Sequence, residues 1–306
     1  MEIDEREKEV PSLAVGLLNL AEALWPSGQL REAEGTARRA LGISLEIDRW
    51  GEEVSLRIVG TVLAARGEVS HSEVALHRGL AICGALGLPQ GEGIVSAFLA
   101  QRQLWHRQPG EAVPLAKQAW ELAHAERHER DFIRAARLHG EAALGLGDLA
   151  TADERLQHAL TRARAVNFAE EEILALTTLA ELHRQRKEYN AALELLDQVW
   201  APAERGPYPL WHSDARNVLA QIERDLGDRD AAVAAATQAY RLAWCDGPPY
   251  AYYFGLTNAR RHLQELGAPE PQVPPFDPAK FPPMPEVELN PKDEFWVDPA
   301  TLDIGE

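Results

Sequence analysis

The stretch GDLATADERLQHAL, Gly147–Leu160, opens with a glycine, has an alanine five residues later and ends with an alanine followed by a leucine. The same arrangement recurs along the chain at spacings of 39 or 40 residues. Such a constant period is typical of repeat proteins, in which each unit stacks on its neighbours. The equivalents of Gly147 in this register are Gly28, Gly67, Arg107, Lys187, Gly227 and Gly267.

Small residues recur at two further positions of each unit, and small side chains let two helices approach closely. Apolar residues at three- and four-residue intervals, as in LAVGLLNLAEAL (13–24), predict helices. We therefore expect each unit to be a helix A, a turn and a helix B. The small residues before the turns are Ala21, Gly60, Ala100, Gly140, Ala180 and Ala220. Those after the turns are Ala33, Ser72, Ala112, Ala152, Ala192 and Ala232.

This pattern resembles the tetratricopeptide repeat superfamily, and the resemblance covers residues 12–267. It implies an all-α fold, a right-handed α-solenoid of six tetratricopeptide-like helix pairs followed by a closing helix. The period of 40 residues exceeds the usual length of about 34. The longer unit is similar to the arrays of bacterial STAND signalling ATPases and of quorum-sensing peptide receptors.

The two ends of the chain differ from the repeats. Residues 1–11 are predicted to be the remnant of a preceding helix or a linker, because EID at residues 2–4 repeats the EID at 46–48 where a helix B ends. We expect an upstream segment or a partner chain to cover the first repeat. Residues 268–306 are rich in proline and are predicted to form an extended tail. Its expected anchors are Phe276, Phe281, Phe295 and Trp296.

Several local features qualify the regular pattern. Pro114 is expected to delay or kink the third helix B, and Pro202 to end the fifth one early. Thr151 and Glu154 have the spacing of a capping box at the start of a helix B. The aromatic segment AWCDGPPYAYYF (243–254) is expected to pack at the end of the stack.

Composition excludes several classes of function. The formal net charge of −17 argues against nucleic-acid binding, which needs a basic surface. No apolar run is long enough to cross a membrane, and the acidic N-terminus lacks the features of a secretory signal. Cys83 and Cys245 lie far apart in the sequence. We expect a soluble, cytoplasmic protein.

No motif in the sequence points to catalysis. A P-loop, a Gly-x-Ser-x-Gly motif and a His-Glu-x-x-His motif are all missing from the sequence. His124 and His128 share a helix face but have no evident third ligand. We predict no enzyme activity, no catalytic residues, no metal and no cofactor.

The resemblance implies a concave groove lined by the A helices. It implies a cradle for an extended peptide or an acidic ligand, held by guanidinium and amide groups; an ordinary surface of Arg–Glu pairs is the alternative. Reversing the charge of two of three arginines, Arg137, Arg184 and Arg224, is expected to abolish binding with little effect on folding. The predicted groove residues are Arg57, Arg134, Arg137, Glu141, Glu181, Arg184, Asn217, Gln221, Arg224 and Arg261.

These observations favour an interaction module that binds a protein or peptide, as the sensor or scaffold part of a bacterial signalling or defence assembly. A fused or associated signalling domain is expected upstream. The alternative is a receptor for a small signalling molecule or short peptide that changes the curvature of the superhelix.

Overall fold

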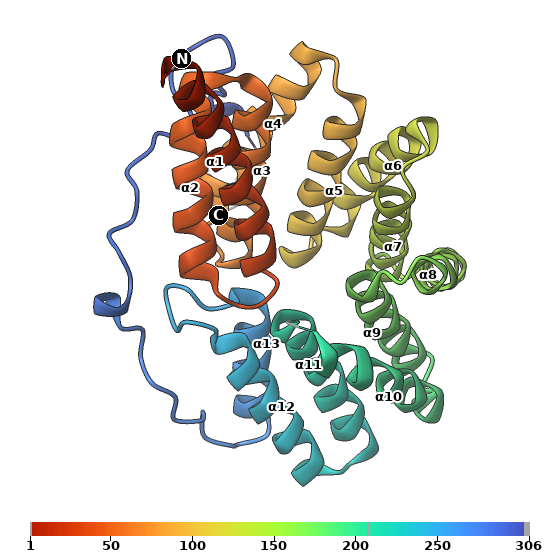
Figure 1. Ribbon diagram of the computed structural model, residues 1–306. Coiled ribbons are helices and arrows are strands. Elements are labelled where there is room, and N and C mark those ends of the chain that lie inside the picture. The colour runs from red at the N-terminus through yellow and green to blue at the C-terminus, as the bar shows by residue number, and fades with distance from the viewer. Residues whose placement is uncertain (1, 207, 303–306) are drawn as a thin grey trace.

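The computed structural model describes residues 2–206 and 208–302, and this part of the chain contains thirteen α-helices and no strand. The prediction of six helix pairs and a closing helix is confirmed, and consecutive helices pack on one another along the array (Figure 1). The helices are α1 (Glu2–Leu24), α2 (Leu30–Ile47), α3 (Arg49–Ala65), α4 (Val69–Leu86), α5 (Pro89–Trp105), α6 (Pro109–Glu126), α7 (Glu129–Gly145), α8 (Leu149–Ala165), α9 (Ala169–Gln185), α10 (Tyr189–Arg205), α11 (Pro209–Leu226), α12 (Arg229–Trp244) and α13 (Tyr253–Glu265).

The glycine that opens the repeat ends helix A. Between α7 and α8 the Gly147 N–H donates to the Leu144 carbonyl (3.0 Å) and the Asp148 N–H to the Ala143 carbonyl (2.9 Å). These two hydrogen bonds form a Schellman motif, which needs a left-handed residue at its turn. Gly147 has a φ of 80°, and all seven predicted turn positions have φ between 59° and 86°.

Small residues lie where helices A and B cross. The six small residues predicted in helix B are all fully buried. A β-carbon added to Gly140 of α7 would come within 2.7 Å of Leu156 Cγ in α8. In the second pair, the two helices come close enough for the Ser72 hydroxyl to donate a hydrogen bond to the Gly60 carbonyl (2.8 Å). The recurring small residues therefore mark the contacts between the paired helices.

The proline and capping-box predictions are wrong where they concern helix ends. Pro114 lies inside α6 and Pro202 inside α10, and both helices keep the 40-residue register of their neighbours. A proline removes one backbone hydrogen bond, but Pro202 is itself buried and helix packing outweighs the loss. At the start of α8, Asp148 accepts a hydrogen bond from the Thr151 N–H, so Asp148 rather than Thr151 is the cap.

The array curves so far that its two ends meet (Figure 1). The ring of Trp25, after α1, meets the ring of Trp211 in α11 edge to face at 5.5 Å. The Arg66 guanidinium lies 4.1 Å from the centre of the Tyr250 ring, in the connection between α12 and α13. The solenoid is therefore closed into a ring, which the sequence did not predict.

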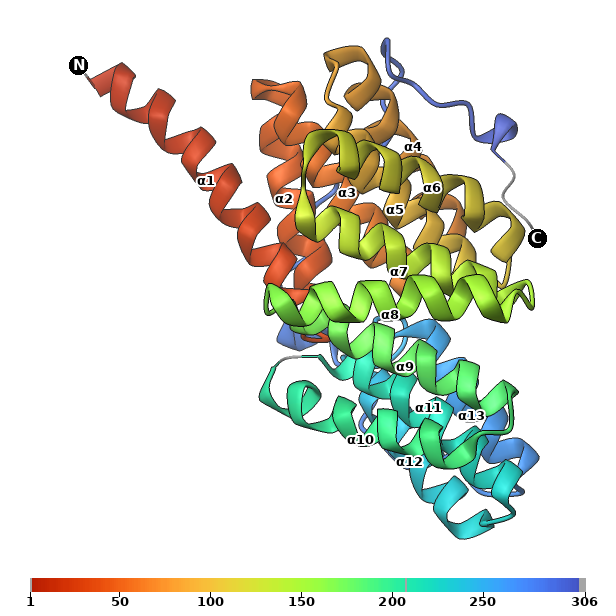
Figure 2. The ribbon, with the colours of Figure 1, turned by 90° about the vertical axis from the view of Figure 1, so that its right-hand side faces the viewer.

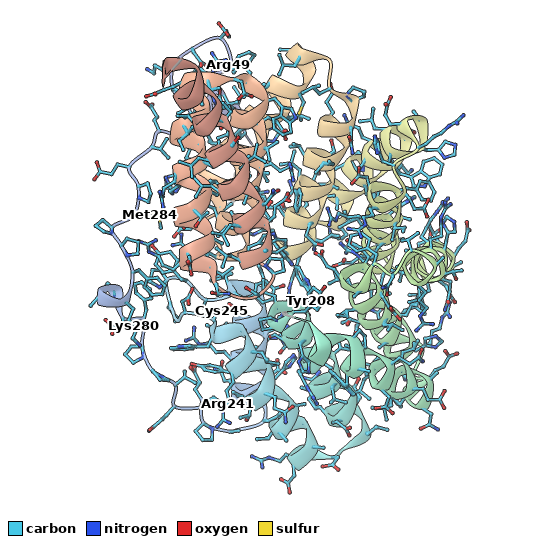
Figure 3. The ribbon with its side chains drawn as sticks, in the orientation of Figure 1. Arg49, Tyr208, Arg241, Cys245, Lys280 and Met284 are labelled. Carbon is cyan, nitrogen blue, oxygen red and sulfur yellow. The ribbon has the colours of Figure 1, made fainter. Side chains whose placement is uncertain are left out.

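The C-terminal tail runs along the outside of this ring, from α12 across α2 toward α4 (Figure 1). It is extended, as predicted, apart from two short 3-10 turns at Pro278–Lys280 and Pro299–Thr301. The Trp244 Nε1–H donates to the Pro274 carbonyl (2.8 Å) and Arg31 donates to the Pro282 carbonyl (2.5 Å). Figure 3 shows Met284 of the tail beside α2.

Three of the four predicted aromatic anchors hold the tail. Phe276 packs on Tyr250 at 4.9 Å and on Phe281 at 5.4 Å, and Phe295 lies under the Arg49 guanidinium at 4.9 Å. Trp296 is 41% exposed and contributes less than predicted.

The first helix is continuous from Glu2 to Leu24, so the predicted boundary at residue 12 falls inside α1. Its N-terminal part projects beyond α2 (Figure 2). Leu17 and Leu18 are buried, whereas Leu13 is 50% exposed. An upstream segment or partner that covers this face stays a prediction.

Candidate functional site

A cavity of about 250 Å³ lies on the concave side of the ring. Its wall is formed by A helices of successive repeats, α5, α7, α9 and α11, and by Tyr252 with the N-terminal part of α13. A smaller cavity adjoins it and shares Gln101, Trp105, Leu174 and Trp211 with it. The concave face is therefore hollow where the middle repeats meet the closing segment.

Aromatic rings form one side of the main cavity. Trp105 of α5 stacks on Phe254 at 5.3 Å and meets Tyr252 edge to face at 5.9 Å. Trp211 of α11 meets Tyr252 at 6.3 Å. Because Tyr252 and Phe254 belong to the segment that closes the ring, the cavity and the closure share the same residues.

Beside the aromatic wall lies a buried network of charges. Arg137, which is 2% exposed, donates to Glu171 (2.6 Å), Glu141 (2.7 Å) and Gln101 (2.9 Å). Arg134 donates to the same Glu171 carboxylate at 3.0 Å. Burial alone would raise the pKa of Glu171, but the two guanidiniums lower it below its usual value. All three nitrogens of the Arg137 guanidinium therefore donate hydrogen bonds to groups of the protein itself.

Asp214 of α11 stands apart from this network. Among the described residues its hydrogen-bond partner is the Tyr252 hydroxyl, which donates to it at 2.9 Å, and no basic side chain forms an ion pair with it. Burial raises the pKa of Asp214 to about 8, although the bond from Tyr252 lowers it in part. Asp214 is therefore a carboxyl group at the cavity wall without a counter-ion.

Two residues that line the cavity each carry a buried polar atom without a partner in the described part of the protein. These atoms are the indole nitrogen Nε1 of Trp211 and the amide oxygen Oδ1 of Asn217. The amide nitrogen of Asn217 is engaged, because it donates to the Gly255 carbonyl at 3.0 Å. Asn217 is 4% exposed and Trp211 is 2% exposed.

The structure divides the ten predicted groove residues into three groups. Those that line the main cavity are Glu141, Glu181, Asn217 and Gln221. Those that line the adjoining cavity are Arg134 and Arg137. Those that line neither cavity are Arg57, Arg184, Arg224 and Arg261.

Most of the predicted arginines are paired with carboxylates. Arg184 donates to Glu181 (2.7 Å) and Asp225 (2.5 Å), and Arg224 pairs with Glu265. Arg57 lies 3.4 Å from both Glu53 and Glu22. Within the described residues, Arg261 makes no ion pair and donates instead to Asn258 at 3.3 Å.

The prediction that charge reversal has little effect on folding is wrong for Arg137. That side chain is buried and bonded to three partners, so a change to Glu would leave Glu171 and Glu141 beside a third carboxylate. Removing one partner of a buried ion pair typically costs about 3–5 kcal/mol. Arg137→Glu is therefore unsuited to test binding.

The sequence pattern did not single out the aromatic wall. Tyr252 and Phe254 lie in AWCDGPPYAYYF, which the sequence predicts to pack at the end of the stack, and they do pack there. Only ring closure brings them to the cavity, and that depends on the curvature accumulated over six helix pairs. The signal available in the sequence was the density of aromatic residues beside the last repeat.

No group of three or more potential metal ligands occurs among the residues that the structure describes. In the same part of the chain, no helix is both long and apolar enough to cross a membrane.

Comparison with known proteins supports the fold. A tetratricopeptide repeat model matches residues 213–243, which lie in α11 and α12. Among curated protein sequences there is no match.

Three solved structures share the fold at low sequence identity. NprR in complex with its cognate peptide NprX is 12% identical, with 86% of this chain and 77% of that chain covered and a TM-score of 0.65. Rap protein complexed with competence and sporulation factor is 16% identical, with coverages of 82% and 75% and a TM-score of 0.59. A STAND protein with a tetratricopeptide repeat sensor from Pyrococcus horikoshii is 14% identical, with 85% of this chain but 43% of that chain covered and a TM-score of 0.53.

Proposed function

From its fold, which is that of the tetratricopeptide-type solenoids, we propose that this chain is a binding module that holds a short peptide in the main cavity. The observation that carries the proposal is that Trp211 and Asn217, which both line the cavity, each hold a buried polar atom without a partner, Nε1 and Oδ1. One is a donor and the other an acceptor, and a peptide unit offers one carbonyl and one N–H. A buried polar group without a partner costs about 1–3 kcal/mol, so a peptide that satisfies both atoms would bind favourably.

The similar structures support a peptide as the ligand. Two of them were solved with a peptide or a signalling factor bound, and a third carries its repeats as a sensor. We infer for this chain the role of a sensor or scaffold in a bacterial signalling or defence assembly, in the cytoplasm and with a signalling domain fused or associated upstream.

A second candidate function is a receptor whose curvature changes with the ligand. The observation that favours it is that Trp105, Trp211, Tyr252 and Phe254 belong both to the cavity wall and to the contact that closes the ring. A ligand that displaces or reinforces these rings would act on the closure directly.

Filling the cavity tests the proposed function. Thr178 of α9 lines the main cavity, and its hydroxyl donates only to its own helix, to the Leu174 carbonyl at 2.9 Å. Thr161 of α8 is exposed and makes the equivalent bond to the Gln157 carbonyl at 2.8 Å, which makes it a matched control. Thr178→Trp is expected to lower peptide affinity at least tenfold, while Thr161→Trp leaves it unchanged.

The measurement is affinity selection of peptides from a random heptapeptide library, followed by titration of the retained peptides. Thermal melts of the variants show whether they are folded. If Thr178→Trp is folded and retains the same peptides as the wild type with equal affinity, the cavity is not the binding site.

A further inference from the structure

The charges around the main cavity are unequally compensated. Of the three carboxylates on its wall, Glu141 is paired with Arg137 and Glu181 with Arg184. Asp214 is the third and has no basic partner among the described residues. The cavity therefore holds one carboxyl group whose charge the protein does not balance.

One basic side chain, that of Arg107, also lines the cavity. It is exposed, and it donates to the Asn258 amide oxygen at 3.3 Å. An exposed charge is screened by water and salt, whereas a charge at the buried end of a cavity acts at lower dielectric. Arg107 is therefore a weak competitor for Asp214, whose half-buried carboxyl group is left to set the charge of the ligand group beside it.

Four aromatic residues line the same cavity as this carboxyl group. They are Trp105, Trp211, Tyr252 and Phe254. Aromatic faces attract cations, most strongly where the cation is desolvated. The unpartnered Asn217 Oδ1 adds an acceptor, and that residue is 4% exposed. A carboxylate, an amide oxygen and aromatic rings together form a receptor for a positively charged hydrogen-bond donor.

We propose that the main cavity selects a basic group, an ammonium or guanidinium, with Asp214 as its counter-ion, Asn217 Oδ1 as a second acceptor and the aromatic wall around it. This inference rests on the proposed function and names the ligand class. It replaces the expectation of an acidic ligand, because the predicted arginines are already largely paired within the protein.

The affinity for such a ligand is expected to depend on pH. Asp214 must lose its proton to pair with a cation, and burial sets its pKa at about 8 in the free protein. The charged or titratable groups that line the cavity with it are Glu141, Glu181, Tyr252 and Arg107; of these, Tyr252 donates to Asp214 and Glu141 raises its pKa. Affinity should therefore rise by up to about tenfold per pH unit between pH 6 and 8.

The test uses affinity selection with two random heptapeptide libraries, one with blocked termini and one with a free N-terminal amine. Enrichment of Arg or Lys in the blocked library identifies a side chain as the basic group, and binding confined to the free library identifies the N-terminus. In either case Asp214→Asn should reduce affinity at least tenfold and remove its rise with pH. The control is Asp197→Asn, which removes an exposed carboxylate of α10 outside the cavity and should change neither.

The other outcomes overturn either the inference alone or the proposed function as well. Acidic or uncharged peptides as the selected class, or basic peptides bound equally by Asp214→Asn, would overturn the inference and leave the proposed function standing. If the wild type retains no peptide from either library, the proposed function fails and the inference with it.

Discussion

At the scale of the single residue, the left-handed turn after each helix A is the feature on which the repeat depends. Five of the seven turn positions are glycine, and Arg107 and Lys187 adopt the same conformation with φ of 59° and 62°. A residue with a β-carbon is strained there, by about 1 kcal/mol, and glycine is not. The two exceptions are therefore sites of stored strain.

Exchanging residues at two of these turns measures the strain. Gly147 has no heavy atom within 4 Å of an added β-carbon, so Gly147→Ala changes backbone conformation and adds no clash. It should lower the free energy of unfolding by about 1 kcal/mol, whereas Lys187→Gly should raise it by about 0.5–1 kcal/mol. Urea denaturation gives both values. If the free energy of unfolding changed with the same sign in both variants, the two turn positions would not be strained.

Asp214 makes a prediction about stability in the absence of ligand. Its pKa is raised from 3.8 to about 8, so the folded state binds a proton that the unfolded state releases between these values. Its contribution to stability is complete below about pH 4 and is lost as the pH rises to 8. Asp214→Asn should therefore become more stable than the wild type as the pH rises, by at most about 1.4 kcal/mol per pH unit. Thermal melts at pH 4, 6 and 8 check this, and a difference that does not change with pH would contradict it.

At the scale of the element, helix positions follow from the sequence because each helix pair repeats the same local signals. Turn glycines, small crossing residues and apolar spacing all agree, and this agreement overcomes isolated signals such as Pro114 and Pro202. The tail is different. Its extended form follows from its proline content, but its course depends on contacts with residues 200 and more positions away.

The strongest of these contacts joins Asp293 of the tail to Arg78 of α4, at 2.7 and 2.8 Å. Arg78 also donates to Glu52, and both of these side chains are fully buried. The hydrogen bonds from Arg78 lower the pKa of Asp293 well below its usual range. The sequence does not reveal this pair, because neither residue stands out from the many other charged residues.

Replacing Asp293 with Ala should loosen the tail. The expected loss is about 1.5–3 kcal/mol at neutral pH, because the buried guanidinium loses charge-assisted bonds. The loss should shrink as the pH falls below the usual pKa of a carboxyl group, because the unfolded chain then takes up a proton that the folded carboxylate binds only at much lower pH. Denaturation and limited proteolysis measure stability and tail release, with Glu288→Gln, an exposed change in the same tail, as the control. A tail that resists protease equally in both variants would contradict this role.

At the scale of the whole molecule, closure of the ring creates the candidate site. The A helices alone supply Glu141, Glu181, Asn217 and Gln221, four of the predicted groove residues, to the cavity wall. Tyr252 reaches the cavity only because the last connection meets the first repeats. Curvature is the sum of small rotations at every helix pair, so it cannot be deduced from a single repeat.

The central claim is that the ligand binds inside the ring, and hydrogen exchange with and without a selected peptide tests it most directly. The account predicts slower exchange on binding in five segments, residues 101–107, 141–144, 174–181, 211–221 and 252–258, which together hold the residues of the cavity wall. Exchange in α8 and α10, which line neither described cavity, should change little. Protection confined to the tail or to the B helices, with the cavity segments unchanged, would contradict the account.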